Sequence, residues 1–500
     1  MQGQMEWTAE QAVSLFCQAA VQSGLIEQED VDYSINLLLD LLKLSAPQEA
    51  ASLLPIHDLA NYLVDYAISI GLCDKGNEAR DRFKTKLFGR VTPGPAAIRE
   101  KFNRINLKSG AKAATDWLYH LCCANDYIKI RRINRNIRHQ AVLPQGELEL
   151  LFDLAKPEKD ENDLVAARLT PQQSYPKCVL CRENPGYAGR PGFPARQNHR
   201  IIPMQLHHET WYFQFSPYQY YPQQYLVINS NHQIMSLSLS DFQRMFEVID
   251  TYPHYFIGSN ADLPIVGGSI LTHEHFQGGS YDFPLKKAKT WFTIDTKDDE
   301  VKGEALRWPM TCMKFKSASK DKLLNIMIRI LDSWSTYSDP ELGIVARSQE
   351  RHNSLTSIIT KDGDSYSVYL LLRNNRCTPE HPHGIFHPHE EYQHIKKENI
   401  GLIEAMGLII LQGNLRKELD QVEDFLLNES PLPPESPHRL WVKELLEALP
   451  ETPLDESGMK EFVLEQLGIV CYKLMCDTGV YKQDQSGEEG LKKYLDTVFQ

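Results

Sequence analysis

Three polar residues recur at every second position of one short segment: His273, His275 and Gln277. The side chains of a β-strand point alternately to its two faces, so a strand over residues 269–277 places all three on one face. Glu274 and Phe276 then point the other way. Paired glycines flank the motif on both sides, which lets a ligand or another stretch of backbone come close.

These residue types suit covalent transfer of a nucleotidyl group. The neutral form of imidazole predominates at neutral pH, because its ordinary pKa is about 6.5, and it can attack phosphorus to give a reactive phosphoramidate. The amide of Gln277 could hold a non-bridging phosphate oxygen without adding charge. A second imidazole or a carbonyl could fix the tautomer of the attacking ring. The alternative is a pair of histidines with a structural role beside a turn.

A second constellation is the Cys-x-x-Cys pair formed by Cys178 and Cys181. Two cysteines supply two soft ligands, and a closed zinc site needs four. His232 and His273 are the donors that we expect to complete such a site. A pair of reduced, buried cysteines would explain the same residues without a metal.

Five further histidines lie between residues 381 and 394: His381, His383, His387, His389 and His394. No amide falls two residues after either His-Pro-His pair, because Ile385 and Glu391 occupy those positions. We therefore expect these histidines to shape a turn or line a pocket. An aromatic run over residues 211–221 favours a half-buried strand, although it could also supply a wall for one uracil.

Three kinds of sequence pattern predict the elements that position these residues. Apolar residues recur at helical spacing over residues 8–109 and 114–127. Residues 127–139 form a basic amphipathic stretch, which is either a solvated helix face or one wall of a phosphate-handling cleft. From about residue 145, alternation typical of strands predominates, with helical patterns at 241–250 and 322–334.

These patterns predict an α+β fold with a largely antiparallel sheet. We expect strands over residues 147–154, 211–215, 225–229, 255–258, 269–276, 354–360 and 367–372. Residues 285–322 are charged and predicted to be irregular, and they join two halves that look faintly alike. We divide the chain into a helical region (1–145), a first half (146–284), a second half (285–395) and a helical C-terminal region (396–500).

The motifs together resemble the class II branch of the galactose-1-phosphate uridylyltransferases, distant relatives of the histidine triad superfamily. The resemblance is carried by residues 178–190, 198–203, 215–218, 272–279, 373–375, 384–389 and 394–401. It implies two histidine-triad-like halves, exchange of UMP between UDP-glucose and galactose 1-phosphate in galactose metabolism, and a covalent uridylyl-histidine. It also implies a homodimer, a structural zinc and no organic cofactor.

The resemblance assigns roles to particular residues. His275 matches the catalytic histidine and Gln277 the accompanying amide, whereas Glu274 and Phe276 stand where class I enzymes have Pro and Gly. The remaining assignments are Asn184 and Asn198 for uridine, Arg373 for a phosphate, Lys397 and Glu404 for the hexose, and Cys178, Cys181, His232 and His273 for zinc.

Composition limits the alternatives. The 500 residues carry 53 Lys+Arg against 66 Asp+Glu, a formal net charge of -13, so the whole chain has no attraction for nucleic acid or anionic membranes. We expect a cytoplasmic protein without a signal peptide, a membrane span or a disulfide framework. One rival is another histidine-triad reaction, with water or phosphate as acceptor. Another is a zinc-stabilised nucleic-acid-binding protein, which the acidic balance disfavours.

Overall fold

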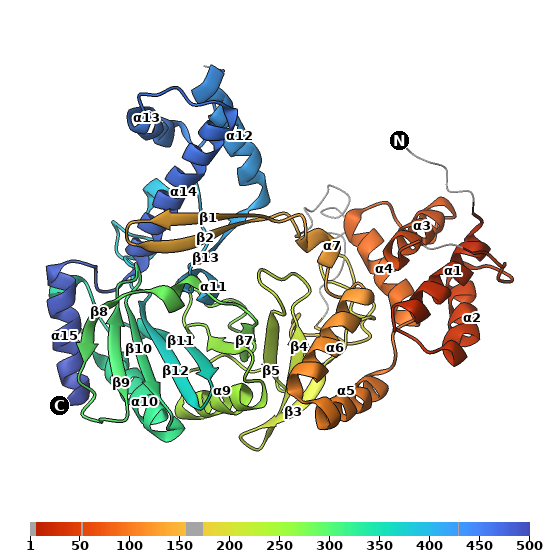
Figure 1. The fold of residues 1–500 in the computed structure, drawn as a ribbon, viewed down its shortest axis with the longest axis horizontal. Coiled ribbons are helices and arrows are strands. Elements are labelled where there is room, and N and C mark those ends of the chain that lie inside the picture. The colour runs from red at the N-terminus through yellow and green to blue at the C-terminus, as the bar shows by residue number, and fades with distance from the viewer. Residues whose placement is uncertain (1–6, 52–53, 157–173, 429) are drawn as a thin grey trace. The chain divides into compact units, whose positions relative to one another are not determined.

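The computed structural model describes residues 7–51, 54–156, 174–428 and 430–500 (Figure 1). The chain divides into two compact units. Unit 1 comprises Met1–Asn134, Ala155–Gln219 and Tyr225–His232, and unit 2 comprises Arg135–Leu154, Tyr220–Gln224 and Gln233–Gln500. The fourfold division of the sequence stays a prediction.

The first part of unit 1 is helical, as predicted. Its helices are α1 (Ala9–Gln22), α2 (Val31–Leu42), α3 (Ile56–Ser69), α4 (Asn77–Arg90), α5 (Pro95–Ser109), α6 (Ala111–Ala124) and α7 (Ile130–Ile133). A capping box between Thr8 and Gln11 starts α1. Leu59 and Leu63, four residues apart on one face of α3, are both buried.

Unit 1 also holds a three-stranded antiparallel arrangement of β3 (Ile202–Leu206), β4 (Glu209–Phe215) and β5 (Tyr225–Asn229). Alternate aromatic residues of β4 point inward: Trp211, Phe213 and Phe215 are buried. The ring of Phe213 stacks on Tyr225 of β5, with centroids 4.9 Å apart. These contacts confirm that the first part of the aromatic run, up to Phe215, belongs to a core strand.

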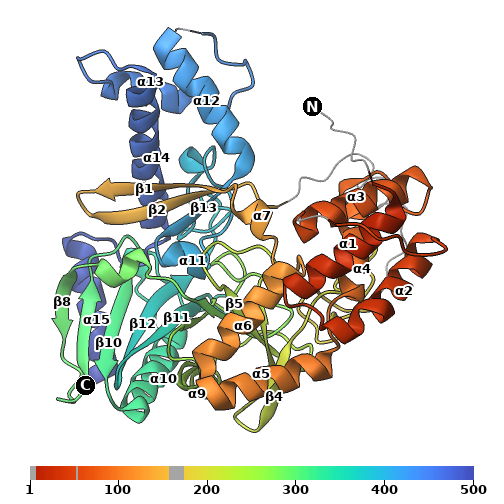
Figure 2. The same ribbon diagram turned by 45° about the vertical axis from the view of Figure 1, so that its right-hand side comes forward.

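The larger sheet of unit 2 has the strand order β7-β6-β11-β12-β10-β9-β8. Its strands are β6 (Phe256–Ser259), β7 (His275–Gly279), β8 (Thr290–Ile294), β9 (Lys302–Leu306), β10 (Cys312–Ser317), β11 (Asn353–Asp362) and β12 (Ser365–Asn374), and every pairing among them is antiparallel. Helices α9 (Leu239–Thr251) and α10 (Lys320–Thr336) pack on one face of this sheet (Figures 1 and 2).

A smaller sheet in unit 2 joins distant parts of the sequence. Strand β2 (Gly146–Asp153) pairs antiparallel with β1 (Ile137–Leu143) and parallel with β13 (Leu408–Gln412). A hydrophobic core joins this sheet to the larger one and includes Phe152, Phe256 and Leu408. The C-terminal helices are α11 (Leu402–Ala405), α12 (Gly413–Asn428), α13 (Arg439–Ala448), α14 (Glu456–Thr478) and α15 (Gln485–Phe499).

Three predicted elements differ from the structure. The basic stretch is helical only in α7 and then becomes strand β1. Residues 285–322 contain β8, β9 and β10, and in β9 and β10 charged side chains alternate with buried ones and hide the strand pattern. The predicted strand over residues 269–276 begins only at His275, because His273 lies in a turn in which its backbone N–H donates to the Ile270 carbonyl at 3.1 Å.

Candidate active site and metal centre

His275 and Gln277, the predicted nucleophile and its accompanying amide, share one face of the larger sheet in unit 2. Gln277 of β7 stands opposite Gly258 of β6, and Gly258 stands opposite Ile358 of β11. Directly opposed residues of antiparallel strands point to the same side. A side chain at Gly258 would meet Leu402 of α11, with a closest approach of 2.8 Å. Gln277 and its strand neighbour His275 therefore face the side on which α11 lies.

Glu274, the residue before His275, faces the helical side of the sheet, as the alternation predicts. Glu274 is buried, and its carboxylate accepts a hydrogen bond of 2.6 Å from the Gln233 side chain. It also lies 3.9 Å from Arg244 of α9. Phe276 is buried as well. The side chains of Glu274 and Phe276 therefore point to the face opposite that of His275, the candidate nucleophile.

The ring of His275 is held in one tautomer by the backbone. His275 is 3% exposed, and its Nδ1 lies 2.7 Å from the carbonyl oxygen of His273. A carbonyl oxygen only accepts, so Nδ1 carries the proton and Nε2 keeps its lone pair. Burial lowers the pKa of His275 to about 4, and the hydrogen bond to the carbonyl partly opposes this effect. The ring is therefore neutral near pH 7 and able to act as a nucleophile.

The flanking glycines permit close packing within unit 2. Gly267 has a φ of +90°, and a side chain there would lie 2.6 Å from the Cα of Gly401. At Gly279 an added Cβ would lie 2.5 Å from the ring of Tyr221. Of the two uses expected for these glycines, the approach of other protein segments is the one that these two positions show.

The Cys-x-x-Cys pair lies beside one of its expected partners in unit 1. The sulfurs of Cys178 and Cys181 are 3.6 Å apart, and the Cys181 sulfur is 3.3 Å from Nδ1 of His232. Two sulfurs bound at about 2.3 Å to a tetrahedral zinc lie roughly 3.8 Å apart, so this donor set fits zinc. These residues belong to a group that could hold a metal ion. Burial raises the pKa of Cys181 to about 11, so its thiolate form requires a nearby cation.

Two residues expected to contact uridine have structural partners in unit 1. The side-chain amide of Asn184 donates to the carbonyls of Cys178 and Cys181, at 2.9 and 2.7 Å. The side chains of Asn198 and Asn125 each donate to the other's carbonyl, at 2.7 Å. Asn184 thus braces the cysteine loop, and Asn198 joins two segments of unit 1. Their contact with uridine stays a prediction.

The residues expected at the hexose phosphate differ sharply in burial. Arg373 is 1% exposed and donates to the carbonyl of Ile400 at 2.6 Å. Burial lowers its pKa to about 10, and the nearby carboxylate of Glu404 opposes that effect. By register, Arg373 lies on the same face of the sheet as Gln277. Lys397, in contrast, is exposed.

The lysine that contacts Glu404 is Lys396, the neighbour of the predicted Lys397. Lys396 is buried, lies 3.3 Å from Glu404 and donates to the carbonyl of Ile410 at 2.9 Å. Glu404 also accepts from the backbone N–H of Gly401 at 3.1 Å. Sequence reasoning missed Lys396 because it predicted a helical region from residue 396 onward, whereas residues 396–401 lie outside any helix.

The additional histidines form pairs rather than a metal cluster among the residues that the structure describes. His381 stacks on His389, with ring centroids 4.6 Å apart, and His387 contacts the Asn399 side chain at 3.0 Å. His394 Nδ1 lies 2.9 Å from Nδ1 of His438. These contacts agree with the expected structural role.

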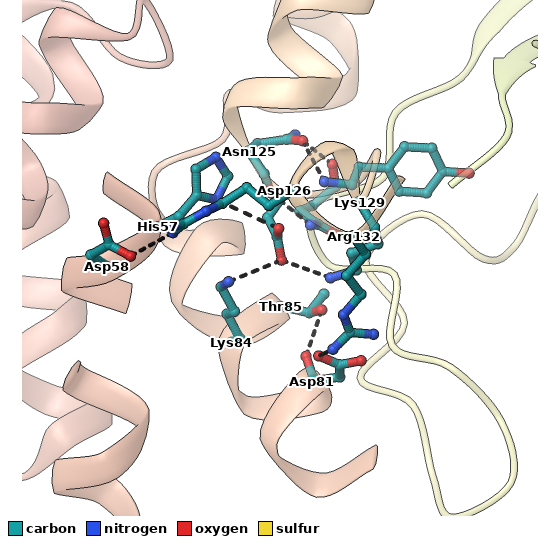
Figure 3. A network of polar contacts seen from close by, with 12 residues as sticks. His57, Asp58, Asp81, Lys84, Thr85, Asn125, Asp126, Lys129 and Arg132 are labelled. Atoms are coloured by element: carbon teal, nitrogen blue, oxygen red, sulfur yellow. Dashed lines mark hydrogen bonds and ion pairs between the residues drawn. The ribbon is translucent and has the colours of Figure 1, made fainter. Parts of the chain in front are cut away.

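Acidic side chains of unit 1 pair with three cations of the basic stretch. Lys129 pairs with Asp126 at 2.7 Å, Arg131 with Asp58 at 2.5 Å and Arg132 with Asp81 at 2.7 Å. Asp126 is buried at the centre of this network, which Lys84 and His57 also join at 3.6 and 3.5 Å (Figure 3). Because three of the five Lys and Arg residues of the stretch have an acidic partner in unit 1, most of its charge is balanced and it does not favour binding to a polyanion. Sequence reasoning missed Asp126, for which no motif gives a signal.

Within the described part of the chain, no helix is both long and apolar enough to cross a membrane.

Comparison with known proteins gives matches over most of the chain. Models of the N-terminal and C-terminal domains of galactose-1-phosphate uridyl transferase match residues 26–217 and 247–442. A galactose-1-phosphate uridylyltransferase of Caldanaerobacter subterraneus is 40% identical, with 96% of each chain covered. One from Fusobacterium nucleatum is 37% identical over 96% of this chain and 97% of that protein.

Among solved structures, yeast Ap4A phosphorylase Apa2 in complex with Ap4A is 13% identical, with a TM-score of 0.34, over 70% of this chain and 96% of that one. The matched domains and the near-full-length relatives show that this chain belongs to the galactose-1-phosphate uridylyltransferase family.

Proposed function

We propose that this chain is a nucleotidyltransferase that exchanges UMP between UDP-glucose and galactose 1-phosphate. The products are glucose 1-phosphate and UDP-galactose, which places the enzyme in galactose metabolism. The observation that carries the proposal is the 2.7 Å contact between Nδ1 of His275 and the His273 carbonyl, which leaves Nε2 unprotonated. The names of the relatives support galactose 1-phosphate as a substrate and the transfer of a uridylyl group.

The reaction proceeds in two half-reactions at one nucleophile. Nε2 of His275 forms a bond to the α-phosphorus of UDP-glucose, and the bond from that phosphorus to the bridging oxygen breaks. Glucose 1-phosphate leaves with the electron pair and needs no general acid, because a phosphate is a good leaving group. A phosphate oxygen of galactose 1-phosphate then attacks the uridylyl group and restores the free imidazole. The amide of Gln277 holds a non-bridging oxygen through both steps.

The proposed substrate contacts follow the family pattern. Asn184 and Asn198 face the uridine, while Lys397 and Glu404 contact the hexose. The exposure of Lys397 supports direct contact with a charged ligand. Arg373 donates a hydrogen bond to the Ile400 carbonyl and contributes positive charge to the proposed phosphate site.

We also propose a structural zinc held by Cys178, Cys181, His232 and His273. The distances among the first three ligands support it. Such an ion would neutralise the two thiolates and fix the cysteine loop, with no direct part in the transfer of UMP. A cytoplasmic location and a homodimer complete the proposal.

The decisive experiment treats the purified protein with radiolabelled UDP-glucose alone. One UMP per chain should be retained and one glucose 1-phosphate released, and galactose 1-phosphate should then discharge the label as UDP-galactose. The adduct should be labile to acid and stable to base, as a phosphoramidate on imidazole is. Release of free UMP without an acceptor would indicate a hydrolase instead. Retention of no label, with intersecting lines in double-reciprocal plots, would overturn covalent catalysis by any histidine of this chain.

A further inference from the structure

A hydrogen-bonded series of serine, histidine and asparagine lies in unit 2, and the proposed transfer of UMP does not use it. The hydroxyl oxygen of Ser348 is 2.7 Å from Nε2 of His352. Nδ1 of the same ring is 2.9 Å from Oδ1 of Asn375. Ser348 is exposed, and the other two side chains are half-buried. We propose that these residues form a second nucleophilic site, at which Ser348 accepts an acyl group from small activated esters.

The hydrogen bonds fix the position of each proton. The side-chain N–H of Asn375 donates to the carbonyl of Pro264 at 3.3 Å, so its oxygen is the atom that faces His352. That oxygen can only accept, and Nδ1 of His352 therefore carries the ring proton. Nε2 keeps its lone pair and accepts the hydroxyl proton of Ser348. This is the arrangement in which an imidazole acts as general base for a serine nucleophile.

The backbone holds the three groups in place. Ser348 N–H donates to the carbonyl of Glu350 at 3.1 Å, and His352 N–H donates to the carbonyl of Ala346 at 2.8 Å. The N–H of Asn375 in turn donates to the carbonyl of His352 at 3.0 Å. The serine and its base thus sit on one short hairpin, anchored to the segment that carries the orienting amide. Preorganisation of this kind lowers the entropic cost of the reaction.

A second anchor holds the base end of the hairpin. Arg351, next to His352, pairs at 2.6 Å with the buried carboxylate of Asp262. Ser354 also donates to that carboxylate, at 2.6 Å. Movement of His352 away from Ser348 would therefore break an ion pair as well as backbone hydrogen bonds.

The proposed step conserves atoms and electrons. The Ser348 oxygen forms a bond to the ester carbonyl carbon, and its proton passes to Nε2 of His352. The bond to the alcohol oxygen then breaks, the alcohol leaves with that proton, and an acyl-serine remains. Water activated by the same ring can later release the acid. Asn375 is neutral and stabilises the imidazolium less than a carboxylate would, so esters with good leaving groups, such as aryl acetates, are the expected class.

The test incubates the full-length protein with p-nitrophenyl acetate. It follows release of p-nitrophenolate and maps the acetyl group by mass spectrometry. One acetyl group should appear on the peptide that contains Ser348. Ser348→Ala and His352→Gln should each lower its formation by about 10² or more, the usual contribution of a general base and its nucleophile. Ser335→Ala is the matched control, because Ser335 is half-buried and its hydroxyl donates to a backbone carbonyl rather than to an imidazole.

Two further variants make the outcome decisive. Asn375→Asp should raise the rate of acylation, because a carboxylate stabilises the imidazolium that forms. His275→Ala should leave the acetylation of Ser348 unchanged, which separates this site from the proposed uridylyl site. Equal labelling of Ser348→Ala, or labelling confined to lysines or His275, would overturn the proposal. A folded Asn375→Asp variant that acylates more slowly would refute the assigned protons.

Discussion

The imidazole of His275 is oriented by the backbone carbonyl of His273, two residues earlier in the chain, through a contact of 2.7 Å. The two residues therefore play unequal parts, although both are histidines of one motif. His273 lies in a turn and offers its carbonyl, whereas His275 begins a strand and offers a nucleophilic nitrogen. The tautomer of His275 is thus independent of the side chain at position 273.

His275→Ala should lower the exchange of UMP by three orders of magnitude or more, on the order seen when a covalent nucleophile is removed. The variant should still fold and bind UDP-glucose, measured by calorimetry. His383→Ala is the control, and it should keep most of the activity. If the activity disappeared with His383 instead, the assignment of the motif would be wrong.

Cys178→Ser should lower the zinc content and the melting temperature together, because the binding energy of a structural zinc is part of the folding energy. Metal analysis and thermal unfolding of the same preparation check this expectation. Cys377→Ser is the matched control, since Cys377 is exposed and lies outside the candidate group. Fully active wild-type protein that contains no metal would remove zinc from the proposal.

Two adjacent lysines allow the hexose site to be dissected. Lys396→Met removes a buried partner of Glu404 and should cost about 2–4 kcal/mol of unfolding free energy, measured in urea. Lys397→Met should leave stability unchanged, because Lys397 is exposed. It should instead raise the KM for galactose 1-phosphate. An unchanged KM in a folded Lys397→Met variant would exclude direct contact with the hexose phosphate.

Asp126 should be essential for the stability of unit 1. Burial alone would raise the pKa of this carboxyl, but Lys129, His57 and Lys84 hold it well below its ordinary value. Asp126→Asn leaves the buried cations without their counter-charge and should cost about 3–5 kcal/mol. Asp40→Asn breaks only an exposed pair with Lys43 and should change stability by less than about 1 kcal/mol. Equal unfolding midpoints in urea for the two variants would contradict this account.

Acid should weaken the fold through the paired rings of His394 and His438. Burial and the neighbouring His438 lower the pKa of His394 to about 4. The unfolded chain then binds a proton first as the pH falls, so this contribution to stability is present above pH 6.5 and is lost towards pH 4. His394→Gln should flatten the pH dependence of the melting temperature in that range. The exposed His120→Gln variant should keep the wild-type slope, and the same slope in both would count against the assignment.

The sequence predicts the α+β class and the common face of His275 and Gln277 because strand alternation is a local property. It also predicts the bounds of β5 without error. It does not reveal the turn at His273, since the alternating letters continue through that turn. The sequence also does not predict that Lys396, rather than Lys397, is buried, because an irregular segment has no repeating pattern from which the orientation of its side chains could be inferred.

The roles of Asn184 and Arg373 illustrate a different limit. Their positions follow a family motif, but the motif does not say which neighbours they bind. In the structure both donate to backbone carbonyls: Asn184 to those of Cys178 and Cys181 in its own loop, and Arg373 to that of Ile400, 27 residues away. The Ser348 series is similar, because His352 and Asn375 meet only when β11 pairs with β12.

The parallel pairing of β2 with β13 has a consequence for synthesis. Leu408 pairs with Glu149, so β2 emerges from the ribosome roughly 250 residues before its partner. At about 5–20 residues per second, the delay is on the order of 10 to 50 seconds. During that time β2, whose apolar face includes Leu148 and Phe152, lacks the β13 strand at its edge. We expect nascent chains that end before residue 408 to be the species that aggregates or recruits chaperones in a translating cell.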